Sequence, residues 1–209
     1  MGKRETFLKS IVYNSFKNYD YQKLNLGQLK KSEYYNEALG IYKKLGGIQI
    51  DIPFNYRKWD ISTDSFTIEL DEELHFNRYR LSTLNSKIYT QSPLRNILDI
   101  HNYMAHCVNY EGNCLKAGGY SGKWKNDSTE KQFLRSNAFG NLEGNGSSRW
   151  KQRAFYDFAK DISSLFINVP FYRISIYENF NGLSIGDILD NENEYLLLNY
   201  LKIRLKLKL

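Results

Sequence analysis

Residues 66–71, with the sequence Phe-Thr-Ile-Glu-Leu-Asp, alternate strictly between apolar and polar side chains. A period of two is typical of a β-strand, in which successive side chains point to opposite faces of the sheet. The apolar side chains would face a core, while Thr67, Glu69 and Asp71 would share the other face. The segment therefore predicts a strand with two carboxylates on one side.

A second alternating segment, residues 48–52, reads Ile-Gln-Ile-Asp-Ile and ends before a proline. We expect it to pair with residues 66–71 as the other strand of a hairpin-like pair. Its Asp51 would point away from the neighbouring isoleucines and so away from the core. Asp51 would then join the acidic face of Glu69 and Asp71.

Helical spacing of apolar residues predicts several helices. The predicted helices are residues 4–18, 32–45, 78–106 with an interruption near Ser92-Pro93, 149–166 and part of 183–200. Two further strands are predicted at residues 172–177 and, as an edge strand rich in lysine, at residues 201–209. This mixture indicates an α+β fold with a small mixed sheet flanked by helices.

Local signals place some of the helix ends. Ser32 and Ser147-Ser148 can cap the helices that follow them, and Gly46-Gly47 can end a helix. Residues 108–148 are rich in Gly, Asn, Ser and Lys without a sustained period, which predicts an irregular segment. We expect one domain over residues 1–209, with residues 90–148 as a large irregular insertion in its core.

Charge and composition narrow the classes of protein. A net charge of +6 favours anionic partners such as DNA. No apolar run is long enough to cross a bilayer, no secretory signal is visible at the start, and two cysteines are too few for a disulfide framework. We therefore expect no membrane partner and a cytoplasmic location. No nucleophile elbow, dinucleotide fingerprint or kinase pattern is present.

The two carboxylates of the predicted strand could bind a metal ion. Glu69 and Asp71 would lie about 7 Å apart at Cα, a spacing that lets both contact one Mg²⁺ or Mn²⁺ and its waters. Asp51 could contribute a third oxygen. Such a metal supports hydrolysis of a phosphodiester bond. The structural alternative is a solvated acidic strand end that binds no metal.

Basic and imidazole side chains follow these carboxylates closely. His75 could act as a general acid or base, and Arg78 and Arg80 could hold phosphates. Residues 69–76, Glu-Leu-Asp-Glu-Glu-Leu-His-Phe, resemble the E-x-D-G-x-x-H signature of very-short-patch-repair endonucleases and their bacterial relatives. That family is a branch of the restriction-endonuclease-like, or PD-(D/E)xK, fold.

The resemblance implies roles for individual residues. Asp71 would be the principal metal ligand, His75 a catalytic or orienting residue, Glu37 a remote acidic partner, and Glu69 a supporting carboxylate. This sequence departs from the signature at Glu72, which replaces glycine, and in the long segment before the next helix. In the general D…(D/E)-x-K pattern, Asp51 and Glu69 would be the carboxylates and Asp71 would stand where lysine is expected.

Two basic segments could contact nucleic acid. Residues 118–125 combine glycines and two aromatic residues with Lys123 and Lys125, and residues 149–153 carry Arg149, Lys151 and Arg153 at a predicted helix start. The structural alternative is that glycine-rich surface loops with lysines are ordinary. Neither segment is a phosphate-binding P-loop.

Four residues could bind zinc, namely His101, His106, Cys107 and Cys114. Their spacing matches no standard zinc finger, and buried free cysteines beside a helix explain them as well. We therefore leave zinc outside the main prediction.

Three hypotheses follow. The first is a metal-dependent DNA endonuclease in repair, restriction or defence, in which Asp71→Ala abolishes cleavage at little cost in stability because Asp71 is exposed. The second is a catalytically inactive nucleic-acid-binding or protein-interaction module on the same scaffold. The third is a zinc-stabilised regulatory domain. The sequence is compatible with a homodimer and with a partner protein.

Overall fold

A computed structural model describes residues 2–90, 94, 97–118 and 120–206. The chain is a mixed α+β protein that is mostly helical. It divides into two compact units. The sheet unit comprises residues 1–21, 59–72 and 168–209, and the helical unit comprises residues 22–58 and 73–167. Two compact units can still fold together, so the single domain stays a prediction.

The sheet unit is built on three short strands in the order β1-β2-β3, which are Ile61–Ser62, Thr67–Asp71 and Phe171–Ser175. β1 pairs with β2 antiparallel, and β2 pairs with β3 parallel from Thr67↔Phe171 to Asp71↔Ser175. The sheet is therefore mixed, as the sequence predicted. The predicted strands at residues 66–71 and 172–177 are confirmed to within one or two residues.

The strand β2 is buried along its whole length. Its polar side chains do not form the solvent-facing acidic surface that alternation predicted. Glu69 is 2% exposed and Asp71 is 1% exposed. The alternation is real, but the apolar and the polar side chains of the strand are both buried, so the solvated acidic strand end is wrong as well.

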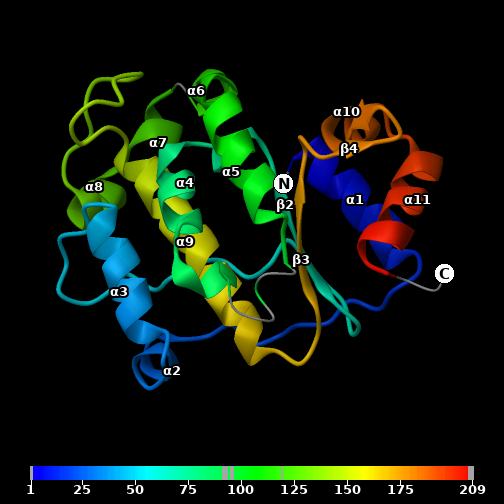
Figure 1. The fold of residues 1–209 in the computed structure, drawn as a ribbon, viewed down its shortest axis with the longest axis horizontal. Helices are drawn as coiled ribbons and strands as arrows, with labels where there is room; N and C mark the ends of the chain where they lie inside the picture. The colour runs from blue at the N-terminus through cyan, green and yellow to red at the C-terminus, as the bar shows by residue number, and fades with distance from the viewer. Residues whose placement is uncertain (1, 91–93, 95–96, 119, 207–209) are drawn as a thin grey trace. The chain divides into compact units, whose positions relative to one another are not determined.

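Three helices complete the sheet unit: α1 (Lys3–Tyr13), α10 (Ile185–Asp190) and α11 (Glu194–Arg204). Figure 1 shows α1 beside α10, and Arg4 on α1 donates two hydrogen bonds of 2.7 Å to Asp190 at the end of α10. A small hairpin of β4 (Asn179–Phe180) and β5 (Leu183–Ser184) precedes α10. Its turn residues Asn181 and Gly182 both have positive φ, as a two-residue hairpin requires.

The predicted edge strand at residues 201–209 is wrong where the chain is described. Leu201 to Arg204 continue helix α11, and Leu201 and Leu205 are buried. Leucine at every second position also recurs at every fourth, so Leu201 and Leu205 share one helix face. Residues 207–209 lie outside the described residues.

The helical unit surrounds one central helix, α9 (Ser148–Ser163), extended by the 3₁₀ turn η4 (Ser164–Phe166). This confirms the predicted helix at residues 149–166, and the Ser147 side chain caps it by accepting the Trp150 N–H. In Figure 1, α9 runs between neighbours that include α3 (Tyr35–Lys44), α4 (Arg78–Leu84) and α8 (Asp127–Phe133). Nearly all of its side chains are buried, including Asp157 and Asp161.

Further helices complete the helical unit. They are α2 (Leu26–Lys30), α3 (Tyr35–Lys44), η1 (Glu73–His75), α4 (Arg78–Leu84), η2 (Lys87–Thr90), α5 (Ile100–Asn109), α6 (Glu111–Gly118), α7 (Ser121–Trp124) and α8 (Asp127–Phe133). The irregular segment predicted for residues 108–148 is therefore wrong for the helices up to Phe133 and confirmed for residues 134–147, which form neither helix nor strand. Short helices with polar, capped ends lack the sustained period that marks a long helix. Whether residues 90–148 form an insertion stays a prediction.

The predicted helix at residues 4–18 ends earlier, at Tyr13, and that at residues 32–45 is confirmed as α3. Gly46 ends α3 with φ +85°, and the Gly46 and Gly47 N–H groups donate to the Lys43 and Tyr42 carbonyls. This pair of hydrogen bonds is a Schellman motif. The predicted Ser32 cap is wrong, because Tyr34 precedes the helix without a side-chain cap.

The predicted strand at residues 48–52 is absent from the described sheets. Its backbone instead bonds within the helical unit, where the Ile48 N–H donates to the Gln132 carbonyl. Ile50 is 93% exposed, and Asp51 forms a surface ion pair with Lys30. Alternation alone cannot make a strand without a partner, and β1 takes the edge of β2 that this segment was expected to fill.

Candidate functional site

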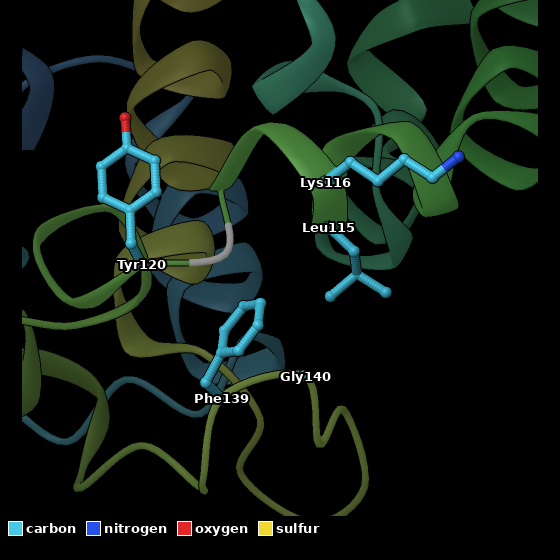
Figure 2. Close-up of a pocket in the computed structure, with 5 residues that line it drawn as sticks. All are labelled: Leu115, Lys116, Tyr120, Phe139 and Gly140. Atoms are coloured by element: carbon cyan, nitrogen blue, oxygen red, sulfur yellow. The ribbon is translucent and has the colours of Figure 1, made fainter.

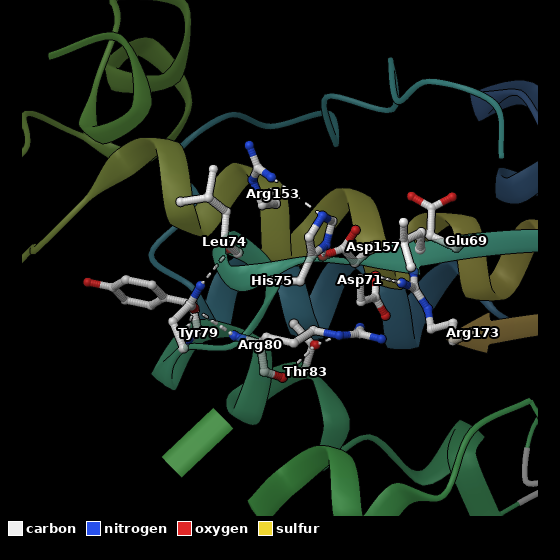
Figure 3. A network of polar contacts seen from close by, with 12 residues as sticks. Glu69, Asp71, Leu74, His75, Tyr79, Arg80, Thr83, Arg153, Asp157 and Arg173 are labelled. Atoms are coloured by element: carbon white, nitrogen blue, oxygen red, sulfur yellow. Dashed lines mark hydrogen bonds and ion pairs between the residues drawn. The ribbon is translucent and has the colours of Figure 1, made fainter. Parts of the chain in front are cut away.

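The acidic motif is divided between the two units. Asp71 is the last residue of β2, and the segment 59–72 of the sheet unit ends at Glu72. The segment 73–167 of the helical unit begins at Glu73, in the 3₁₀ turn η1 that contains His75. The polar side chains of both halves are drawn in Figure 3.

In the sheet unit, Asp71 is held by an arginine of the neighbouring strand. Arg173 on β3 donates a hydrogen bond of 2.6 Å from Nη1 to Asp71 Oδ1, and both side chains are almost fully enclosed. Glu69 Oε2 accepts the Asp60 N–H at 3.3 Å, and Asp60 in turn accepts the Leu70 N–H at 3.0 Å. These carboxylates are thus embedded in the backbone of the sheet.

The burial of Asp71 corrects an expectation about stability. The sequence argument held that Asp71→Ala costs little because the side chain is exposed, and this is wrong. Removing one partner of a buried ion pair leaves the other charge uncompensated, at a cost of about 3–5 kcal/mol. Loss of activity in Asp71→Ala would therefore need a separate check on folding.

A second acidic side chain in the sheet unit is also constrained. Glu178 accepts hydrogen bonds from Tyr200 Oη and from the Ser175 N–H, with Arg204 Nε 3.6 Å away. Burial raises the pKa of Glu178, and Arg204 opposes that rise. Glu178 therefore joins β3 to α11 as a structural group.

In the helical unit, His75 contacts a carboxylate of the central helix. His75 Nδ1 lies 2.8 Å from Asp157 Oδ2, and the side chains are 14% and 4% exposed. Arg153, one turn before Asp157 on α9, places Nη1 3.4 Å from His75 Nε2. The three side chains lie together in Figure 3.

The hydrogen bond to Asp157 fixes how His75 can act. A carboxylate accepts the proton of Nδ1, so the lone pair of the neutral ring is on Nε2. Nε2 is then the atom that can take a proton or bind a metal. The arrangement is that of a histidine oriented by a carboxylate.

Asp157 and Arg173 were not among the predicted site residues. A signal for Asp157 was available, since Arg153 and Asp157 are four residues apart on one helix and so share a face. Arg173 gave a weaker signal, because only the register Glu69↔Arg173 shows that it lies beside the acidic strand.

Several predicted site residues have other structural roles. Glu37, on α3, accepts a hydrogen bond from the Ser86 hydroxyl, and Lys87 lies 3.9 Å away. Arg80 is buried and bonds to Thr83, Tyr89 and Asp161. Arg80 therefore has no exposed surface for a phosphate, whereas Arg78 is half exposed and pairs with Glu111.

The other predicted basic residues divide by exposure. Lys151 is buried and donates to Asn145, and its burial lowers its pKa. Burial also lowers the pKa of Arg149, which is half-buried. Lys125 is exposed, and Lys123 is half-buried with its Nζ 4.9 Å from the Tyr120 ring centroid.

The zinc ligands considered from the sequence are not gathered. Among the described residues, no three of His101, His106, Cys107 and Cys114 bring ligand atoms within 4.8 Å of one another. Both cysteines are buried free thiols. Burial raises the pKa of the Cys114 thiol to about 12, which keeps it in the neutral form that binds metal poorly.

The two units differ in charge. The helical unit has twenty Lys or Arg against eleven Asp or Glu, a net charge of +9. The sheet unit has nine Lys or Arg against twelve Asp or Glu, a net charge of −3. The basic character of the whole chain therefore comes from the helical unit alone.

A family model matches residues 40–191, which cover the acidic motif, α9 and β3. The chain belongs to DUF7255, a family of unknown function. No curated protein and no solved structure matches this DUF7255 chain. No helix in the described part of the DUF7255 chain is both long enough and apolar enough to cross a membrane.

Proposed function

We propose that this protein is a divalent-metal-dependent DNA endonuclease that hydrolyses phosphodiester bonds, with His75 as its general base. The single observation that carries the proposal is the contact between His75 and Asp157. The net charge of +9 on the helical unit, which contains both residues, supports a polyanionic substrate. Repair, restriction and defence are the settings in which such an enzyme would act.

The role of His75 follows from its hydrogen bonds. Nε2 accepts the proton of an attacking water, and Asp157 stabilises the imidazolium that this transfer creates. Arg153 Nη1 donates to the same nitrogen at 3.4 Å, so in this proposal Arg153 turns from His75 to the phosphate, where its positive charge is needed, when Nε2 takes the proton. Water attacks phosphorus, the bond to the leaving oxygen of the DNA backbone breaks, and that oxygen takes a proton from solvent to leave as an alcohol.

The donor atoms of the acidic motif are of the kind that Mg²⁺ or Mn²⁺ prefers. Glu69 and Asp71 offer carboxylate oxygens, and an ionised carboxylate can accept from more than one partner at a time. Asp71 could therefore keep its bond to Arg173 and still ligate a metal. When bound, the metal would lower the pKa of a water and offset negative charge on the phosphate.

The restriction-endonuclease-like core belongs to the same proposal. Its support is the mixed sheet, in which β2 carries the carboxylates and pairs with the parallel strand β3. The helix α9 comes between these strands in the chain and supplies Asp157.

Cleavage assays on His75→Gln test the proposal. Supercoiled plasmid, linear duplex and single-stranded DNA would be incubated with Mg²⁺, Mn²⁺ or EDTA. We expect metal-dependent cleavage by the wild type and a rate about 10²- to 10⁴-fold lower in His75→Gln, the usual contribution of a general base. The cleavage rate of Asp157→Asn should also be lower than that of the wild type, because this change removes the carboxylate that orients His75.

The matched control is His101→Gln, which changes an exposed histidine of the same unit. It should cleave as the wild type does. Circular dichroism on each variant separates lost chemistry from lost folding. Cleavage that persists in EDTA, or in a folded His75→Gln variant, would contradict the proposal.

A second candidate is a catalytically inactive nucleic-acid-binding module. The observation in its favour is the pairing of Asp71 with Arg173, because a guanidinium already neutralises the carboxylate that a metal would need. DNA binding that survives EDTA, with no cleavage under any divalent metal, would select this candidate.

A further inference from the structure

An open pocket lies on the helical unit, and its lining residues precede α9 in the chain. It has a volume of about 510 Å³. It is lined by Leu115, Lys116, Tyr120, Phe139 and Gly140. In Figure 2 the side chains of Leu115 and Phe139 point toward one another, and the Tyr120 ring and the Lys116 chain extend away from them on either side.

Two aromatic rings of this pocket are exposed to solvent. Tyr120 is 59% exposed and Phe139 is 54% exposed. Exposed aromatic residues that line a pocket favour a ligand-binding surface, because a ligand that covers their apolar faces removes apolar surface from water. Glu and Asp are absent from the described lining of the pocket.

A rigid support lies beneath Phe139. Its ring packs edge-on against Trp124, with centroids 5.3 Å apart, and Trp124 packs against Trp150 at 5.1 Å. The Trp124 indole N–H donates to the Asn137 carbonyl at 3.0 Å. A flat ligand stacked on Phe139 would therefore lie against a surface that is already ordered.

Two lysines lie at these aromatic residues. Lys116 lines the pocket, and Lys123 places Nζ 4.9 Å from the Tyr120 ring centroid. Aromatic faces next to flexible cations are the combination that binds single-stranded nucleic acid, in which bases stack on rings and lysines contact phosphates. In a duplex the faces of the bases are covered by their neighbours and cannot stack in this way.

We infer that this pocket binds unpaired bases of single-stranded DNA, one stacked on Phe139 and a neighbouring one on Tyr120, with phosphates held by Lys116 and Lys123. The inference rests on the proposed function for its choice of DNA. It adds a DNA-binding site that is distinct from the residues proposed to cleave the strand. It also predicts that the protein binds single-stranded DNA more tightly than duplex DNA.

Fluorescence anisotropy in EDTA tests the inference without cleavage. The probes are a labelled 15-nucleotide oligo(dT), a duplex of the same length and an RNA oligomer of the same length. We expect the wild type to bind the single-stranded DNA most tightly. Tyr120→Ala and Phe139→Ala should each raise its Kd by about 5- to 100-fold, the usual effect of losing one base–aromatic stack.

Conservative variants and a matched control make the result specific. Tyr120→Phe and Phe139→Tyr keep a ring and should bind within about 2-fold of the wild type, since the stacking is retained. Tyr195→Ala removes a tyrosine that is 75% exposed in the sheet unit and should leave Kd unchanged. Lys116→Ala should reduce the slope of log K against log salt by about 0.7.

Four outcomes would overturn the inference: duplex binding as tight as single-strand binding, tighter binding of RNA than of DNA, a Kd unaffected by both alanine variants, or no binding at all. The cleavage assay separates this failure from that of the proposed function. Cleavage lost in His75→Gln with unchanged oligo(dT) binding would show two distinct sites. Binding of oligo(dT) by a wild type that cleaves no DNA would support the pocket as a binding site and contradict the proposed nuclease activity.

Discussion

The helical and sheet units carry opposite net charges, +9 and −3, yet each encloses an arginine–aspartate pair. Arg80 donates to Asp161 at 2.9 Å in the helical unit, and Arg173 donates to Asp71 at 2.6 Å in the sheet unit. Burying a charge requires a partner whatever the charge of the rest of the unit. The positive excess of the helical unit therefore lies outside its buried pair, where it can attract a polyanion.

The largest expected effect is on the buried pairs. Arg80→Met and Arg173→Met each leave a buried aspartate without its guanidinium, so each should lower the free energy of unfolding by about 3–5 kcal/mol. Urea denaturation followed by circular dichroism measures this loss.

The control for Arg80→Met is Arg78→Met, on the same helix. Arg78 pairs with Glu111 at a half-exposed site, so its loss should cost about 1 kcal/mol or less. Equal costs for the two variants would break the comparison between buried and surface pairs.

A smaller effect is expected on DNA binding. Lys125→Glu reverses an exposed charge of the basic unit, next in the chain to the Trp124 against which Phe139 packs, and Lys202→Glu reverses an exposed charge of the acidic unit. Anisotropy titrations at several salt concentrations should show weaker binding and a slope smaller by about 0.7 or more only for Lys125→Glu. Equal changes in both variants would place the DNA contact elsewhere.

The smallest expected effect concerns pH and the helical unit. Burial lowers the pKa of His106 below its usual value, and the smaller influence of Asp99 raises it. The unfolded chain then binds a proton that the folded chain does not, so this group removes stability as the pH falls below about 6.5.

His106→Phe measures that contribution. Phenylalanine cannot titrate and can keep the edge contacts of the ring with Phe76 and Tyr110. The urea midpoint of the variant should fall less between pH 7 and pH 5 than that of the wild type. Parallel pH profiles would show that His106 does not contribute.

The sequence determined the elements whose signals are local. The strand at Thr67–Asp71 and the helix at Ser148–Ser163 follow from periodicity, and the end of α3 at Gly46 follows from a backbone conformation that glycine adopts readily. The pairing of His75 with Asp157 was within reach of the sequence only in part. The i, i+4 spacing placed Arg153 and Asp157 on one face, but nothing local showed which residue they meet.

Only the tertiary structure decided which strand pairs with β2, and therefore which side chains it buries. Residues 48–52 have the alternation of a strand, but Ile61–Ser62 takes that edge, and Asp51 ends on the surface. Asp71 looks like an exposed metal ligand from its neighbours in the chain, but Arg173, 102 positions away, encloses it. Periodicity and turn chemistry act over a few residues, whereas strand partners and the partners of buried charges are chosen by contacts between distant parts of the chain.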